Sequence, residues 1–159
     1  MRGPVSASAK TRLSGLALAI AAAAVFGCAG PPDPVEACLT ITPSEKLHTY
    51  NGQPHVLPIY VYSLASTLAF ERLEVPALLA GDQKIEGVVG GPLELIIYPG
   101  QVVKFHEVLD PKTTQLGIVA DYHRGPNDPP GTRKVVVPAD CGMFGDPKVR
   151  LTPTDILVE

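Results

Sequence analysis

The chain has 159 residues, a length typical of one domain, and hydrophobic residues make up 45% of it. Its formal net charge is −3, which argues against a nucleic-acid partner because phosphates attract basic surfaces. The sequence contains no G-x-S-x-G, no phosphate-binding glycine loop and no H-E-x-x-H. No catalytic motif therefore points to an enzyme.

The first 27 residues are typical of an export signal. Arg2, Lys10 and Arg12 are basic, and the 14 residues from 13 to 26 are apolar and uncharged. As a helix this segment reaches about 21 Å, which is short of a bilayer core of about 30 Å. We therefore expect residues 1–27 to be a cleaved signal peptide. An uncleaved anchor helix is the alternative.

The apolar segment ends in a pattern that resembles the bacterial lipobox. Val25 lies three residues before Cys28, and the small Gly27 lies directly before it. In a lipobox the cysteine thiol is acylated and the chain is cut just before it, so Cys28 is predicted to carry the lipid, palmitate included. Several acyl chains, at about 0.8 kcal/mol per buried methylene, anchor a protein firmly. Ala29 at the next position points to the outer membrane.

The predicted mature chain carries ten basic and sixteen acidic residues. Its negative net charge does not attract anionic lipids, so the acyl chains alone are expected to bind the membrane. Residues 28–36 hold the lipidated cysteine and a proline-rich spacer, and residues 37–159 form the predicted domain. Cys38 and Cys141 remain as an even pair in an exported chain, which favours a disulfide between them. Two unpaired, buried cysteines are the alternative.

Short β-prone segments separated by Pro and Gly follow from residue 37 onward. They predict an all-β, antiparallel sandwich of about seven or eight strands with a short helical insert. Pro58 lacks an N–H and is expected at an edge or a bulge. Pro99-Gly100 fits a type II turn and predicts a tight antiparallel connection between its flanking strands. The predicted strands are residues 37–42, 56–64, 93–98, 101–109, 115–122, 133–137, 148–151 and 155–158.

One segment has helical character. In residues 66–79, Ser66 or Thr67 can cap a helix, and Pro76 limits it to a short helix or to two turns broken there. We expect this insert to cover one end of the sandwich as a small lid.

Two long loops are predicted, residues 44–55 with an Asn51-Gly52 turn signal, and residues 125–132. His48 and His55 lie seven residues apart in the first loop, which fits no metal-site template. We therefore predict solvated histidines, no metal site and no cofactor.

The order of features resembles the TssJ outer-membrane lipoprotein family of type VI secretion systems. The matching segments are Tyr62-Ser63-Leu64 at a strand end, the helical insert Phe70 to Leu79, Gly81-Asp82, the turn Tyr98-Pro99-Gly100-Gln101, and the strand Ile118 to Tyr122. The chain departs from the family pattern after Tyr122, where His123 replaces a common Arg.

The resemblance implies a transthyretin-like β-sandwich that faces the periplasm. It also implies a non-enzymatic role: the protein would anchor the trans-envelope complex at the outer membrane by binding the periplasmic domain of a TssM-like inner-membrane protein. The loop between the first two strands, residues 44–55, would make that contact, with Leu47, Tyr50 and Pro54 as apolar anchors. The predicted contact residues are Lys46, Leu47, His48, Tyr50, Asn51, Gln53, Pro54 and His55.

Three alternatives stay open at this point. The loop could be an ordinary solvent-facing hairpin loop. The protein could carry or sense a small ligand in a β-sandwich. It could also be an envelope enzyme, for which the sequence offers no supporting residues.

Overall fold

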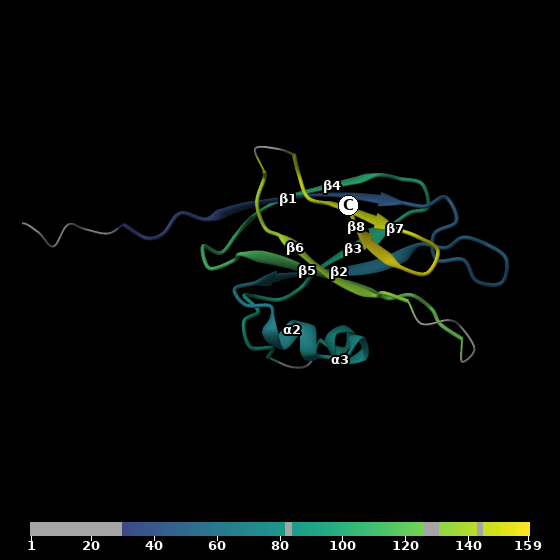
Figure 1. Cartoon of the computed structure of the whole chain (residues 1–159), viewed down its shortest axis with the longest axis horizontal. Coiled ribbons are helices and arrows are strands. Elements are labelled where there is room, and N and C mark those ends of the chain that lie inside the picture. Colours follow the sequence, from purple (N-terminus) through teal and green to yellow (C-terminus); the bar gives the residue numbers. More distant parts are fainter. Residues whose placement is uncertain (1–29, 82–83, 126–130, 143–144) are drawn as a thin grey trace, which may run out of the picture. The chain divides into compact units, whose positions relative to one another are not determined.

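The computed structural model describes residues 30–81, 84–125, 131–142 and 145–159 (Figure 1). The predicted signal peptide, Cys28 and most of the second long loop lie outside the described residues. One compact unit covers Asp33–Glu159 and contains all the described strands and helices. Among the described residues no helix is long and apolar enough to cross a membrane.

Within the described residues, eight strands form two four-stranded sheets, which confirms the predicted β-sandwich. All neighbouring strands are antiparallel except the parallel pair β1–β7. The first sheet has the order β4-β1-β7-β8, with β1 Val35–Pro43, β4 Val103–Leu109, β7 Lys148–Leu151 and β8 Ile156–Val158. The second has the order β3-β2-β5-β6, with β2 Leu57–Leu64, β3 Leu93–Ile97, β5 Gln115–Ala120 and β6 Lys134–Pro138.

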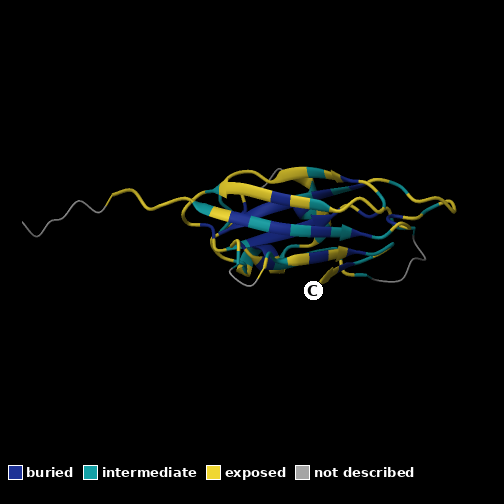
Figure 2. Ribbon diagram, turned by 90° about the horizontal axis from the view of Figure 1, so that it is seen from above, coloured by how far each residue is buried: buried dark blue, intermediate teal, exposed yellow. Residues whose placement is uncertain are grey.

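The main core lies between the two sheets, where Figure 2 shows the buried residues. It follows from alternation along the strands, because successive side chains of a strand point to opposite faces. In β1, Leu39 and Ile41 are buried while their neighbours are half-exposed. Burying each such side chain stabilises the fold by roughly 1.5–3 kcal/mol.

The insert forms two short helices, α2 Leu68–Arg72 and α3 Val75–Ala80. Pro76 lies in the first turn of α3, where a missing N–H costs nothing, so the proline starts the second helix. Thr67 is the N-cap of α2 but makes no side-chain cap hydrogen bond.

The predicted position of the insert, across one end of the sandwich, is wrong. Both helices cover the outer face of the sheet that contains β2, β5 and β6 (Figure 1). Phe70 packs on Gly117 of β5, where an added Cβ would lie only 2.7 Å from the ring. Lys134 of β6 donates hydrogen bonds to the carbonyls of Phe70 (3.1 Å) and Glu71 (2.7 Å), which satisfies the C-terminal end of α2.

Two predictions drawn from prolines are also wrong. Pro99-Gly100 does form a turn, with Gly100 at φ +70°, but it joins β3 of one sheet to β4 of the other. Pro58 lies in β2, a central strand, and is neither at an edge nor at a bulge. It is tolerated because it sits one residue beyond the end of the β2–β5 ladder, where its carbonyl still accepts from Asp121 N–H at 3.0 Å.

Cys38 and Cys141 are joined by a disulfide, as the cysteine count predicts. The bond connects β1 to the segment between β6 and β7, and the two cysteines are 103 residues apart in the chain. It lies on the outer face of the first sheet, because Cys38 alternates with the buried Ala37 and Leu39.

Candidate functional site

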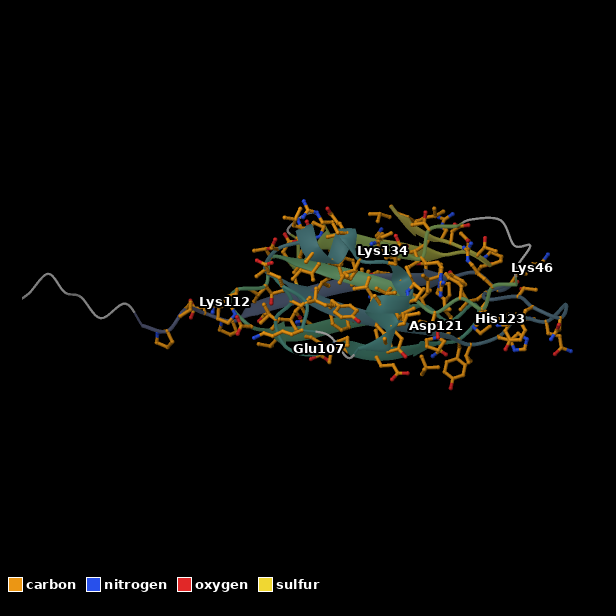
Figure 3. The ribbon with its side chains drawn as sticks, turned by 90° about the horizontal axis from the view of Figure 1, so that it is seen from below. Lys46, Glu107, Lys112, Asp121, His123 and Lys134 are labelled. Carbon is orange, nitrogen blue, oxygen red and sulfur yellow. A yellow bond between two sulfur atoms is a disulfide. The ribbon has the colours of Figure 1, made fainter. Side chains whose placement is uncertain are left out.

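Four connections gather at one end of the sandwich, which we call the loop end. Their described residues are 44–55, 98–102, 121–125, 131–133 and 152–155. At the opposite end, which we call the disulfide end, the chain enters β1 at Val35 and Cys141 is bonded to Cys38. Figure 3 shows Lys46 and His123 at the loop end and Lys112 at the other. The nine residues of β1 separate the two ends by about 26 Å.

The loop 44–55 has an ordered backbone. Asn51 and Gly52 both have positive φ, +53° and +76°, as a two-residue hairpin turn of type I′ requires. Tyr50 and Gln53 on either side exchange both backbone hydrogen bonds at 3.2 Å. The predicted Asn51-Gly52 turn is confirmed, and it carries the tip of the loop.

Leu47 fastens the base of the loop to the core. Its side chain is fully buried, and its carbonyl accepts from His55 N–H at 3.1 Å. The prediction that Leu47 offers an apolar anchor to a partner is therefore wrong, since the side chain is already used inside the fold. Tyr50 and Pro54 remain accessible.

His48 links the loop to the chain segment after β5. The residue is 7% exposed, with Nδ1 2.7 Å from the Val56 carbonyl oxygen and Nε2 2.7 Å from the His123 backbone nitrogen. A carbonyl only accepts and an amide only donates, so the hydrogen bonds assign a neutral ring with its proton on Nδ1. The expectation of a solvated histidine is wrong for His48, because its side chain is buried and hydrogen-bonded to two chain segments.

Aromatic and imidazole rings join the two segments into one surface. Tyr50 and His55 stack at 3.6 Å with planes 12° apart, and His123 lies 5.0 Å from the Tyr50 ring. His123 is exposed and was not among the predicted contact residues. The sequence carries one signal for it: His123 directly follows Tyr122, the last residue of the predicted strand 115–122.

Tyr122 holds the 152–155 turn against the same end. Its hydroxyl lies 3.0 Å from the carbonyl of Thr152 and 2.9 Å from that of Asp155. Burial raises the pKa of Tyr122 above its ordinary value, and the nearby negative charge of Asp155 adds to the rise. The Asp155 carboxylate in turn accepts from Thr132 N–H at 2.6 Å.

The loop end thus offers a mixed aromatic and polar surface whose segments are joined by hydrogen bonds and ring contacts. Within the described part of the chain, its histidines do not join other ligands in a cluster able to hold a metal ion. The surface suits contact with another protein, because rigid aromatic side chains lose little entropy on binding. The accessible residues are Lys46, Tyr50, Asn51, Gln53, Pro54, His55 and His123.

Comparison with known proteins finds one family. A family model described as "Type VI secretion lipoprotein, VasD, EvfM, TssJ, VC_A0113" matches residues 37–141. A search of curated proteins finds no match.

Several solved structures share the fold. The T6SS lipoprotein TssJ1 from Pseudomonas aeruginosa is 23% identical, with a TM-score of 0.66 over 79% of this chain and 95% of that one. Lip from Serratia marcescens, described as a membrane bound component of the type VI secretion system, is 14% identical, with a TM-score of 0.66 over 79% and 96%. A chain of the structure "T6SS protein TssM C-terminal domain (869-1107) from EAEC" is 19% identical, with a TM-score of 0.64 over 78% and 97%. At such identities the likeness shows a shared fold.

Proposed function

This chain belongs to the family of type VI secretion lipoproteins, and on that premise we propose that it is a non-enzymatic adaptor of the secretion membrane complex. In this role its loop end binds the periplasmic C-terminal domain of a TssM-like inner-membrane protein. The lipid on Cys28 holds the other end of the adaptor at the outer membrane.

The observation that carries the proposal is the composite surface at the loop end. Tyr50 is stacked on His55 and His123 is hydrogen-bonded to His48, so two chain segments are held in one arrangement before any partner arrives. A preorganised surface avoids the ordering cost of about 0.5–1.5 kcal/mol per side chain that flexible contacts carry. Tyrosine is also among the residues most enriched at binding hot spots.

The comparison with the structure named for the TssM C-terminal domain supports this partner. Part of the present chain covers 97% of the matched chain, so the matched chain is shorter than 159 residues. The domain given by its residue numbers, 869 to 1107, is longer than that. The matched chain therefore accompanies the TssM domain in that structure and has the fold described above.

The two attachments lie at opposite ends of β1 in this proposal. The chain that leads back to Cys28 leaves the sandwich at the disulfide end, and the partner surface is about 26 Å away at the loop end. Mechanical force between the outer membrane and the secretion complex is then transmitted along β1. This strand is paired on both sides, with β4 and β7.

Binding of a purified TssM-like periplasmic domain to the full lipidated protein in detergent tests the contact. We expect Tyr50→Ala to weaken the affinity at least tenfold, or about 1.4 kcal/mol, because a rigid aromatic contact is lost. Lys46→Glu should weaken binding too. Lys112→Glu is its matched control, since Lys112 is an exposed lysine at the disulfide end (Figure 3).

The proposed surface is refuted if Lys112→Glu weakens binding as much as Lys46→Glu, or if Tyr50→Ala binds like the wild type while its circular dichroism is unchanged. For the anchor, Cys28→Ser should abolish labelling by radioactive palmitate and release the protein from outer-membrane fractions. A variant that is still labelled contradicts the assignment of Cys28.

A second candidate function rests on a pocket beside α2. It has a volume of about 470 Å³, within the range of small-ligand sites, and it lies between α2 and residues 84–87. Apolar Leu68, Leu73 and Ile85 line it together with two cations, Arg72 and Lys84, and one carboxylate, Glu86, which leaves a net positive charge. A small anion that copurifies and dissociates on Arg72→Ala, seen by native mass spectrometry, would favour a carrier function. Protein free of any such ligand would count against it.

A further inference from the structure

Three metal-ligating side chains converge on the outer face of the first sheet, at the disulfide end. Cys38 lies on β1 and His106 lies directly opposite it on β4, while Cys141 comes from the segment between β6 and β7. The two sulfur atoms and the imidazole nitrogen all lie within 4.8 Å of one another. His106 and Cys141 are exposed and Cys38 is half-exposed, so the cluster is open to ions from solvent.

Alternation along the strands brings two of these donors together without help from the disulfide. Leu39 and Phe105 point into the core, so their neighbours Cys38 and His106 point outward. Residues paired across antiparallel strands have Cβ atoms about 4.5–5.5 Å apart. The Cys38–His106 pair is therefore a property of the sheet register.

The third donor is also held in place by contacts other than the disulfide. On one side of Cys141, Ala139 is buried and its N–H donates to the Thr114 carbonyl at 3.2 Å. On the other side, the Pro147 carbonyl accepts from Thr40 N–H at 2.9 Å. Neither hydrogen bond involves a sulfur, so we expect both to persist in the reduced chain.

We propose that the reduced form of this chain has a metal site for Zn²⁺ in these three side chains. The thiolates of Cys38 and Cys141 and one imidazole nitrogen of His106 supply three ligands, and water supplies the fourth. Two thiolates and an imidazole are a typical zinc donor set. Bonds of about 2.0–2.3 Å place tetrahedral ligands roughly 3.5–3.8 Å apart. The exposed imidazole of His106 has to approach by about 1 Å, and the two sulfurs, about 2.0 Å apart in a disulfide, have to separate by about 1.7 Å.

The metal and the disulfide are alternative states of the same two thiols. Before oxidation the lipidated chain carries the thiols of Cys38 and Cys141, and each loses one proton when it binds the metal, while no electron moves. Oxidation by a partner disulfide instead removes two electrons and two protons from the thiols, and reduces that partner disulfide to two thiols. Bound metal therefore has to leave before the disulfide forms, which makes oxidation slower in the presence of Zn²⁺.

Cobalt is a suitable probe because Co²⁺ occupies zinc sites and its bonds to thiolates absorb light. The lipidated full chain in detergent is reduced with a phosphine under anaerobic conditions and titrated with Co²⁺. We expect one equivalent to bind with a thiolate-to-cobalt charge-transfer band, and Zn²⁺ to displace it. The oxidised chain should show no band.

Single substitutions separate a built site from a chance pair of thiols. Cys38→Ser should lose the band, and His106→Ala should keep a band but bind Co²⁺ at least tenfold more weakly. His123→Ala is the matched control, because it removes an exposed imidazole at the loop end. Its affinity for Co²⁺ should equal that of the wild type.

Two results would overturn the proposal. One is reduced wild-type protein, with unchanged circular dichroism, that shows no charge-transfer band. The other is His106→Ala protein that binds Co²⁺ as tightly as the wild type. Neither result touches the proposed adaptor function, because the partner domain is tested with the oxidised chain and at the opposite end of the sandwich.

Discussion

The two ends of the sandwich are held by different means. At the disulfide end one covalent bond joins Cys38 to Cys141. At the loop end the described residues are held by packing and hydrogen bonds, with Leu47, His48 and Tyr122 buried beneath the accessible rings. In the chain-entropy model a disulfide acts mainly by restricting the unfolded chain, so its effect is on stability. A surface built from directional weak bonds depends on every one of them. The comparison therefore predicts that stability and partner binding respond to different residues.

Removal of the disulfide should have the largest effect on stability. We expect the double variant Cys38→Ser and Cys141→Ser to lose up to about 4–5 kcal/mol of unfolding free energy, because its unfolded chain is no longer closed over a loop of about 100 residues. Urea unfolding measures the loss, and the reduced wild type is the control. Where the variant is still folded, it should bind the TssM-like domain with unchanged affinity. Weakened binding would mean that the two ends are coupled.

Leu47→Ala should have the next largest effect, and it should lower both stability and partner affinity. Truncating a fully buried leucine costs about 2–5 kcal/mol, and here it also loosens the base of the loop, so stability and partner affinity should both fall. Leu157→Ala is the control, since this leucine is 47% exposed and on β8. Urea unfolding and binding titrations check the pair. Equal losses in the two variants would contradict the burial of Leu47.

Tyr122→Phe should have the smallest effect on the free energy of unfolding, and the size of this effect should depend on pH. Losing the hydrogen bonds of the hydroxyl costs about 1–2 kcal/mol at neutral pH. Burial raises the pKa of Tyr122, so the folded chain holds this proton more firmly than the unfolded chain. Its contribution is therefore complete below about pH 10, the ordinary value, and is lost as the pH rises further.

The stability of the wild type should accordingly fall more steeply than that of Tyr122→Phe in alkaline solution. Burial also raises the pKa of Tyr62 and Tyr60, so some alkaline loss should persist in the variant. Thermal unfolding between neutral pH and pH 11 measures the two slopes. Tyr98→Phe, at a tyrosine that is 54% exposed, is the control and should keep the wild-type slope. Equal slopes for wild type and Tyr122→Phe would contradict the role given to Tyr122.

Features that depend on neighbours in the chain could be predicted from the sequence. The strands follow from alternation, as in β1 with Leu39 and Ile41, because the pleat sends successive side chains to opposite faces. The Asn51-Gly52 turn follows from the tolerance of these residues for positive φ. Pro76 divides the insert into two helices because its ring and missing N–H are compatible only with a first turn. The even cysteine pair predicted the disulfide.

Features that depend on distant partners were decided by the tertiary structure alone. Pro99-Gly100 makes the same local turn whether its strands share a sheet or, as here, belong to two sheets. In the sequence Leu47 and His48 look like surface residues of a loop. In the folded chain Leu47 is buried in the core, and His48 accepts a hydrogen bond from the His123 amide. The place of the helices depends on Gly117, which leaves room for Phe70, and on Lys134, which satisfies the end of α2. Backbone preferences act over a few residues, whereas burial and pairing join residues far apart in the chain. The order of residues could therefore predict the elements, but only the packed chain could show which side chains of the loop are accessible.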